Sequence, residues 1–320
     1  MKRSRAIAVP PAIAGVFICI ALLLGGCASP QVATLASQWP ATLPVQADLH
    51  NTPFFAQAEY ECGPAALAMA MGAAGAPTTP EALVPQVYLP ARKGSLQVEM
   101  PVAVRRAGLL AYTVAPNLQA VLQEVAAGNP VIVFQNLSLP WYPVWHYAVV
   151  IGYNRDDQTL LMHSGTTARM PISFSAFERT WARGNYWAMV ATPADRLPAT
   201  ADATQLASAV VALERLNPKA AFTIYLNALT RWPTDRSFLL GRGNAAYALG
   251  DLPAAQSAYA AATAAWPDFA DAWNNLAQVL ADQQRLGEAQ AAIGKAVALG
   301  GPRLDTYVAL QKTIVTSRPQ

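Results

Sequence analysis

The sequence predicts two folded parts, an α+β domain followed by an all-helical repeat array. Helical patterns come first in residues 48–195 and strand patterns second, which is the order of an α+β domain. Beyond residue 198, Trp-Pro at 232–233 recurs 34 residues later at 266–267, which indicates a repeat. A chain of 320 residues is long enough to bury a separate core in each part.

The net charge and the numbers of cysteines and histidines argue against nucleic-acid binding and against a metal site. The formal net charge is +3, but Lys2, Arg3 and Arg5 account for it, and 19 basic residues then face 19 acidic ones. No basic face is evident, so we expect no nucleic-acid partner. The three cysteines and three histidines show no metal-ligand spacing, so we expect no metal and no cofactor.

The first 26 residues have the pattern of an export signal. A basic head precedes an apolar run over residues 6–24. Leu-Gly-Gly-Cys at 24–27 resembles the lipobox of bacterial lipoproteins, which implies that Cys27 is lipidated and anchors the chain in a membrane. An uncleaved signal anchor is the alternative, although Pro10 and Pro11 interrupt the apolar run.

The residues after the signal predict where the anchor holds the chain. By resemblance to the sorting rule of Gram-negative lipoproteins, Ala28 implies the outer membrane, with the protein facing the periplasm. Residues 27–47 are polar and contain three prolines without clear periodicity, so we expect a tether.

The helices of the first domain are predicted from apolar spacing and stop signals. The small, apolar run at 64–71 predicts a buried helix, with Cys62 at its N-cap and Pro64 at an early helical position. The other helices are expected at residues 80–88, 96–107, 118–127 and 175–182, the last capped by Ser175.

The strands are predicted from short apolar or alternating runs. Residues 147–153 and 159–163 flank a polar turn at 154–158, so we expect them to form a hairpin. The remaining strands are expected at residues 111–114, 130–135, 172–174 and 186–191.

Cys62 is the candidate nucleophile. A thiol at a helix N-terminus lies at the positive end of the dipole and near unpaired N–H groups, and both favour the thiolate. Gln57, five residues upstream, offers an amide donor to an oxyanion hole. The alternative is that Cys62 is a small hydrophobe in a core helix, which is the commoner role of a cysteine.

His146 is the candidate base. It begins a predicted buried strand 84 residues after Cys62, and this pairing is typical of cysteine hydrolases. A histidine at a strand end is also often structural. The aromatic residues at 141–145 either form a wall of a substrate cleft or fold onto the sheet. We expect Arg92, Lys93, Arg105 and Arg106 to be ordinary solvated charges.

Two motifs resemble a known family. Q-x4-C-G-P-A-A-L from Gln57 and H-Y-A-V-V-I-G-Y from His146 resemble papain-like cysteine peptidases of the bacteriocin-processing, double-glycine type. The likeness covers residues 53–192 and is greatest to exported lipoprotein relatives with C-terminal repeats. It implies a papain-like fold with Cys62 as nucleophile, His146 as general base and ion-pair partner, and Gln57 as oxyanion donor. It also implies small residues, such as paired glycines, before the cut.

The third catalytic position departs from the family pattern. Relatives carry an acidic residue after the strand that follows the histidine strand, and Ser164 most nearly occupies that place, with His163 beside it. Which of the two would serve is left open. A serine can accept the imidazole N–H and fix its tautomer, but it cannot stabilise the imidazolium by charge.

Residues 198–320 resemble tetratricopeptide repeats. Small and large residues recur at matching places in two copies, and a degenerate first copy has Ala221, Tyr225 and Ala228 before Pro233. Residues 303–316 predict a more polar capping helix. We expect these repeats to bind a peptide or protein partner; a spacer or a dimerisation module is the alternative. The matched positions are Leu239, Gly243, Ala255, Tyr259 and Ala262 in one copy and Trp273, Leu276, Ala289, Ile293 and Ala296 in the next.

The combined prediction is a membrane-anchored periplasmic cysteine peptidase acting on a peptide or protein substrate. One alternative is a peptide-binding adaptor lipoprotein with an idle peptidase fold, which the serine at position 164 keeps open. Another is an acyl transferase, because the same Cys-His pair can pass an acyl group to an amine.

Overall fold

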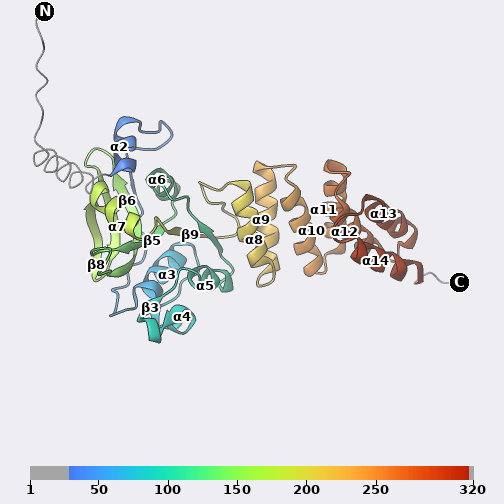
Figure 1. Cartoon of the computed structure of the whole chain (residues 1–320), viewed down its shortest axis with the longest axis horizontal. Coiled ribbons are helices and arrows are strands. Elements are labelled where there is room, and N and C mark those ends of the chain that lie inside the picture. Colours follow the sequence, from blue (N-terminus) through green and yellow to red (C-terminus); the bar gives the residue numbers. More distant parts are fainter. Residues whose placement is uncertain (1–28, 317–320) are drawn as a thin grey trace, which may run out of the picture.

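The computed structural model describes residues 29–316, and the predicted signal segment and lipidation site at Cys27 lie outside them. An N-terminal α+β domain stands at one end, and a row of helices extends from it to the C-terminus (Figure 1). The predicted fold class is confirmed. Within residues 29–316, no helix has both the length and the apolar character needed to cross a bilayer.

The domain is built on a seven-stranded sheet in which all pairings are antiparallel. Its order is β4-β9-β5-β6-β7-β8, and β1 pairs with the far end of β6. β6 is the longest of the described strands, and it includes the predicted strand at 147–153, the two residues before it and Asn154 after it. The bounds are β1 Gln46–Asp48, β4 Leu110–Thr113, β5 Val131–Asn136, β6 Trp145–Asn154, β7 Thr159–Ser164, β8 Thr167–Ser173 and β9 Ala188–Thr192.

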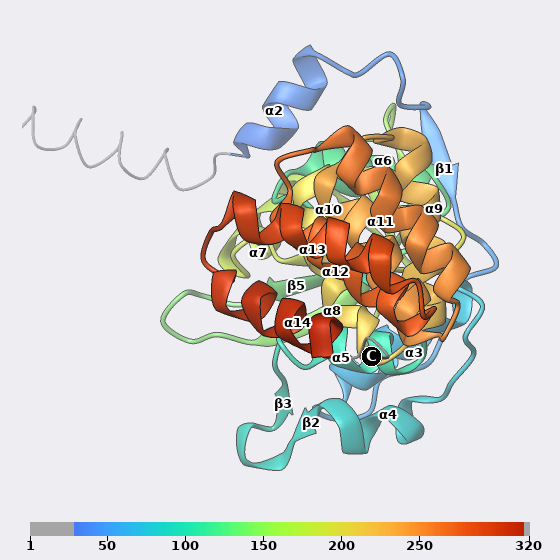
Figure 2. The same cartoon turned by 90° about the vertical axis from the view of Figure 1, so that its right-hand side faces the viewer.

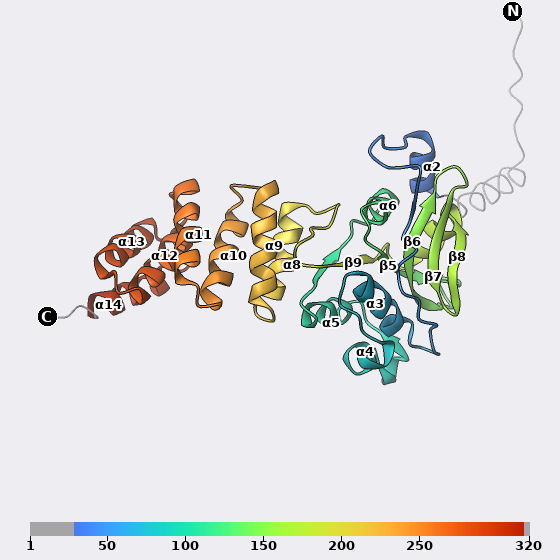
Figure 3. The ribbon, with the colours of Figure 1, turned by 180° about the vertical axis from the view of Figure 1, so that it is seen from behind.

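Helices cover both faces of the sheet, so its central strands are apolar on both sides. Ile132, Val149 and Met189 point into one core with α3. Val133 and Val150 point into the other core with α6 and α7. Figure 3 shows α3, α4 and α5 grouped together, away from α6. The helices are α3 Cys62–Ala73, α4 Pro80–Val87, α5 Met100–Arg106, α6 Leu118–Ala126 and α7 Phe174–Arg183.

Three helix starts differ from the sequence prediction. Cys62 is the first residue of α3, and Glu61 occupies the cap position. α5 begins at Met100 rather than at residue 96. The chain before it forms a small hairpin of β2 (Tyr88–Leu89) and β3 (Gly94–Ser95). Strands of two residues are too short to show a periodic pattern in the sequence. α7 begins at Phe174, since Ser173 rather than Ser175 caps it by accepting a hydrogen bond from the Ala176 N–H.

The predicted tether is docked on the domain over its described part. Residues Pro30–Ser37 form α2, whose Val32 and Leu35 are buried in the core with α6 and α7. The buried carboxylate of Glu178 accepts hydrogen bonds from the backbone N–H groups of Gln31 and Val32, 3.0 and 2.9 Å away. A carboxylate at a helix N-terminus is stabilising. Residues Pro30–Ser37 of the predicted tether thus form a helix packed on the domain.

The C-terminal part is a row of seven helices within the described residues, and Figure 2 views it from the C-terminal end. Glycine permits close approach of neighbouring helices, since a Cβ at Gly243 would lie 2.3 Å from the Tyr259 ring. The helices are α8 Ala203–Glu214, α9 Pro218–Arg231, α10 Arg236–Ala248, α11 Leu252–Ala265, α12 Ala270–Asp282, α13 Leu286–Leu299 and α14 Leu304–Thr316.

The junction between the two parts is packed rather than open. The apolar core around α6 and α7 continues into α8 and α9. The buried Glu124 carboxylate accepts hydrogen bonds from the backbone N–H groups of Ala199 and Thr200 and from the Thr200 hydroxyl. The Gln205 amide donates to the Thr113 carbonyl at 2.8 Å. These contacts fix the start of the array on the domain.

Candidate active site

Cys62 lies at the start of the most buried helix of the domain. Residues Ala65 to Ala70 of α3 are wholly inaccessible, so the helix is held from all sides. Tyr60 has a φ of 66°, a left-handed conformation that turns the chain sharply just before Cys62. Among the described residues Cys62 is the one free cysteine.

A cleft of about 930 Å³ opens beside the thiol. It brings Cys62 and Gln57 together with His146, which lies 84 residues after Cys62 in the sequence. The remaining lining residues are Ala58, Tyr60, Arg92, Lys93, Gly94, Ser95, Leu96, Gln97, Phe134, Tyr142, Pro143, Val144, Trp145, Tyr147 and Gly165.

Two opposing effects act on the Cys62 thiol. Hydrogen bonds from the backbone N–H groups of Tyr147, Gly63 and Cys62 itself lower its pKa. Burial raises the pKa by more, so the net shift is upward from 9.0. The helix start supplies N–H donors to Cys62, as the sequence predicts, but the cost of desolvating a charge is larger.

His146 is held by Ser164 on the neighbouring strand β7. The imidazole Nε2 lies 2.9 Å from the Ser164 Oγ. Burial lowers the pKa of His146 from 6.5 to about 4. Because Ser164 carries no charge, it leaves this burial cost uncompensated, and the imidazole is neutral near pH 7. Burial thus opposes the charged form of each partner in the ion pair that the family resemblance implies.

His163, the neighbour of Ser164, faces away from this constellation. Its Nδ1 accepts a hydrogen bond from the Arg169 backbone N–H at 3.1 Å, so Nε2 carries the proton and donates to the Thr52 carbonyl at 3.3 Å. Its ring packs against Phe54, with the centroids 5.1 Å apart. Of the two candidates for the third position, the serine is the one that contacts His146.

Both polar atoms of the Gln57 side-chain amide form hydrogen bonds. The Nε2 group donates to the Tyr147 carbonyl, and the Oε1 accepts from the Gly165 backbone N–H, each at 3.1 Å. The Gln57 backbone N–H also donates to the Gly165 carbonyl at 3.0 Å. Since Nε2 carries two hydrogens, one N–H stays available to a group bound in the cleft.

Tyr147 connects several parts of the site, a role that no sequence pattern indicated. Its backbone N–H contacts the thiol, its carbonyl accepts from Gln57, and its hydroxyl donates to the Ser95 carbonyl at 3.3 Å. The last bond ties the β2–β3 hairpin to the sheet. This hairpin also explains Gly63, because a Cβ there would lie 2.3 Å from the Ser95 Oγ.

The walls of the cleft include aromatic residues from the loop before β6 and two basic residues that the sequence predicts to be solvated. Trp145 stacks on Phe134 with ring centroids 5.1 Å apart, and Tyr142 also lines the cleft. Arg92 and Lys93, expected to be ordinary solvated charges, lie on the hairpin side. The Lys93 ammonium stands 5.3 Å from the Tyr60 ring centroid. Arg105 and Arg106 belong to α5 and do not line this cleft.

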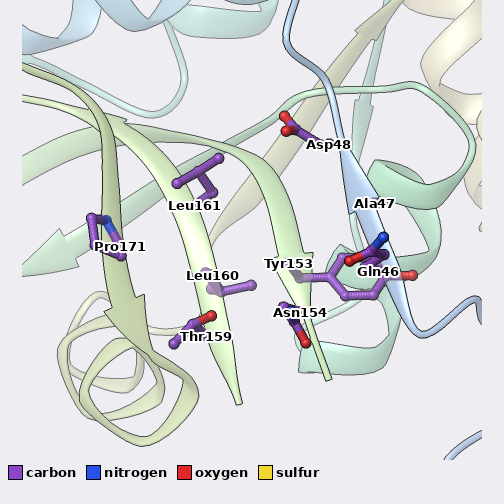
Figure 4. A pocket seen from close by; sticks show the side chains of 9 residues that line it. All are labelled: Gln46, Ala47, Asp48, Tyr153, Asn154, Thr159, Leu160, Leu161 and Pro171. Atoms are coloured by element: carbon purple, nitrogen blue, oxygen red, sulfur yellow. The ribbon is translucent and has the colours of Figure 1, made fainter. Parts of the chain in front are cut away.

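A second hollow of about 380 Å³ lies at the other end of β6, between β1 and β7 (Figure 4). It contains no cysteine or histidine, and Asp48 at its rim pairs with Arg169 at 2.7 Å. The Arg169 hydrogen bond lowers the pKa of the Asp48 carboxyl. This pair joins β1 to β8. No cysteine, histidine or serine lines the hollow, so its lining offers no nucleophile with a base.

Comparison with known families agrees with this architecture. Residues 49–189 match the Peptidase_C39 like family, and residues 206–255 and 240–302 match the tetratricopeptide repeat. No curated protein matches the chain. The chain thus joins a C39-like peptidase domain to tetratricopeptide repeats.

Solved structures resemble the two parts separately. A putative C39-like peptidase from Bacillus anthracis is 16% identical with a TM-score of 0.39, covering 45% of this chain and 96% of its own. The Sgt2 TPR domain from Aspergillus fumigatus is 22% identical with a TM-score of 0.31, covering 34% and 79%. The MamA protein is 18% identical with a TM-score of 0.28, covering 34% and 68%.

Proposed function

We propose that the N-terminal domain is a cysteine peptidase that hydrolyses peptide bonds through Cys62 and His146. The observation that carries the proposal is the convergence of a thiol at a helix start, an imidazole oriented by Ser164 and the Gln57 amide on one cleft. These are the parts of an activated nucleophile with an oxyanion site.

The hydrogen bonds suggest a role for each group. With Nε2–H of His146 donating to Ser164, the Nδ1 lone pair is left to take the thiol proton of Cys62. The sulfur attacks the substrate carbonyl carbon, and the resulting oxyanion accepts from the Cys62 backbone N–H and the second Nε2 hydrogen of Gln57. His146 then gives its proton to the leaving amine. Water, deprotonated by His146, hydrolyses the thioester and restores the thiol.

The electrostatics of the site favour a neutral resting pair. Burial raises the pKa of Cys62 and lowers that of His146 to about 4, so both groups are uncharged near pH 7. Proton transfer from sulfur to imidazole then accompanies the attack rather than preceding it. The negative charge that develops on the substrate oxygen is met by N–H donors. The positive charge that develops on the imidazole is met by the Ser164 hydroxyl rather than by a carboxylate.

The other parts of the chain fit a tethered peptidase. Tetratricopeptide repeats generally mediate protein–protein contacts, so we assign the array to binding the substrate or a partner protein. Lipidation of Cys27 would hold the chain at the outer membrane, facing the periplasm. Only Ala28 and Ser29 separate Cys27 from docked α2, so about 10 Å of chain would link anchor and domain.

The proposal is tested by trapping the acyl-enzyme. The full chain is incubated with a peptide pool from a proteome digest, quenched in acid, and analysed by mass spectrometry. We expect new peptide termini and a thioester on Cys62, both absent from the Cys62→Ala variant. Cleavage that persists in this variant, or no cleavage by the intact chain, contradicts the proposal.

The same experiment separates the two alternatives. The uncharged partner of His146 is the observation that favours an idle, peptide-binding domain. Such an adaptor binds peptides without turnover, equally well with Cys62→Ala. An acyl transferase forms the thioester but yields an amide product when a primary amine is added, whereas the peptidase yields a free carboxylate.

A further inference from the structure

We infer that the loop at residues 137–145, called the aromatic loop below, is a docking surface for an apolar segment of the peptide substrate. This inference rests on the proposed function, because the occupant is the peptide that the peptidase would cleave. It adds a selectivity for large apolar side chains near the cut bond.

The aromatic loop exposes an unusual amount of apolar surface. Trp141 and Tyr142 are 78% and 73% exposed. Exposed apolar side chains that gather in one place commonly mark an interaction site. Four more apolar residues of the same loop are about half exposed: Leu137, Leu139, Val144 and Trp145.

The loop is held open by its own hydrogen bonds. The Asn136 Oδ1 accepts from the backbone N–H groups of Ser138 and Val144, at 3.0 and 2.9 Å. The Leu137 N–H donates to the Val144 carbonyl at 2.9 Å. Figure 2 shows a green loop near β5 that projects away from the domain. Because the base is fixed, the backbone of the loop loses less freedom when a ligand binds.

Stacked rings link the loop to the core below the thiol. Trp145 lies on Phe134 at an interplanar angle of 11°. Phe134 in turn contacts Tyr147, with centroids 4.7 Å apart. Trp145 is 51% exposed and Tyr147 only 1%, so the stack leads from the open cleft into the core. The indole is therefore a fixed platform with one face free.

Continuity with the cleft identifies the occupant. Tyr142, Pro143, Val144 and Trp145 line the same cleft as Cys62 and His146. A peptide placed with its carbonyl at the thiol passes this wall. Large apolar side chains on that peptide would cover surface that is otherwise exposed to water, which is favourable.

The test compares a loop variant with a matched surface variant. Trp141→Ser with Tyr142→Ser removes two exposed rings and leaves the Asn136 bonds in place. Leu216→Ser, in the turn between α8 and α9, removes an exposed apolar side chain that does not line the cleft. Each full chain cleaves the same peptide pool, and residues flanking the cuts are counted.

We expect the unmodified chain and Leu216→Ser to enrich large apolar residues at one or more positions flanking the cut. In the loop variant this enrichment disappears, and kcat/KM for the best apolar peptide falls about tenfold. For the same peptide with glycine at that position, kcat/KM falls by less, so the ratio of the two values falls in the loop variant. Cleavage without enrichment, or enrichment that survives in the loop variant, overturns the inference and leaves the peptidase standing. No cleavage at all overturns both.

Two other occupants are outcomes of a companion measurement. In a Cys27→Ser background, the loop variant and its parent are compared for binding to phosphatidylethanolamine–phosphatidylglycerol vesicles and for sedimentation. A loss of vesicle binding assigns the loop to the membrane. A loss of dimer assigns it to a second copy. Either result with unchanged peptide selectivity overturns the inference.

Discussion

Hydrogen bonds within the domain join residues much farther apart in the sequence than hydrogen bonds within the array do. In the domain, Gln57 bonds to Gly165 and Tyr147, which are 108 and 90 residues away. In the array, Tyr259 and Asn275 both bond to Asn244, 15 and 31 residues away. The candidate site thus depends on the whole domain, whereas each helix pair depends mainly on its neighbours. A single change should therefore act differently in the two parts.

The largest effect is expected at His146. His146→Gln leaves a side chain of similar size that cannot act as a base, so we expect kcat/KM to fall by about 10³–10⁴. The melting temperature should change little at pH 7, because the neutral imidazole and the neutral amide are similar there. Steady-state rates on the best peptide and calorimetry check this. A loss of less than tenfold would mean that another base operates.

Removing a buried aromatic side chain from the array should destabilise the helices around it. Tyr259 is 2% exposed and fills the space left by Gly243. Tyr259→Ala should lower the free energy of unfolding of the array by about 3–5 kcal/mol. Turnover of a short peptide should persist, since the change is remote from the cleft.

The matched control is Tyr259→Phe, which keeps the ring and removes the hydroxyl bond to the Asn244 Oδ1. It should cost about 1 kcal/mol. Hydrogen exchange would locate the loss in α10–α12. Loss of protection throughout the domain would show that the two parts unfold as one unit.

Acid should destabilise the domain through His146. Its pKa is about 4 in the folded chain and 6.5 when unfolded. Between these values the unfolded state binds a proton that the folded state does not, so stability falls as the pH falls from 6.5 to 4. The loss from this group amounts to about 3 kcal/mol at most. Urea titrations at several pH values should show a smaller slope in His146→Gln, and an identical slope would refute the assignment.

A smaller effect is expected when a charged residue replaces Ser164. In Ser164→Asp, a carboxylate beside Nε2 favours the imidazolium, so the pKa of His146 should rise by about one unit or more. The acid limb of kcat/KM, expected near pH 4 in the unmodified chain, should move up with it. Ser164→Asn is the neutral control and should leave the limb in place. If the acid limb stays near pH 4 in Ser164→Asp, the residue at position 164 does not control the pKa of His146.

The sequence by itself determined the order of elements and the candidate residues. Helix periods, strand runs and the 34-residue repeat are local patterns, so the fold class follows from them. The pairing of Cys62 with His146 was predicted from two short motifs. Local patterns failed for the two-residue strands β2 and β3 and for α2, whose stability comes from Glu178 far along the chain.

Only the tertiary structure decided the chemistry around those candidates. Protonation depends on burial and on neighbours brought from distant segments, and no local pattern carries either quantity. The helix N-terminus favours a thiolate at Cys62, yet burial outweighs it. Ser164 rather than His163 contacts His146 because consecutive side chains of β7 point to opposite faces of the sheet and so meet different partners. Desolvation, which is a property of the assembled core, therefore sets the charge of the candidate site.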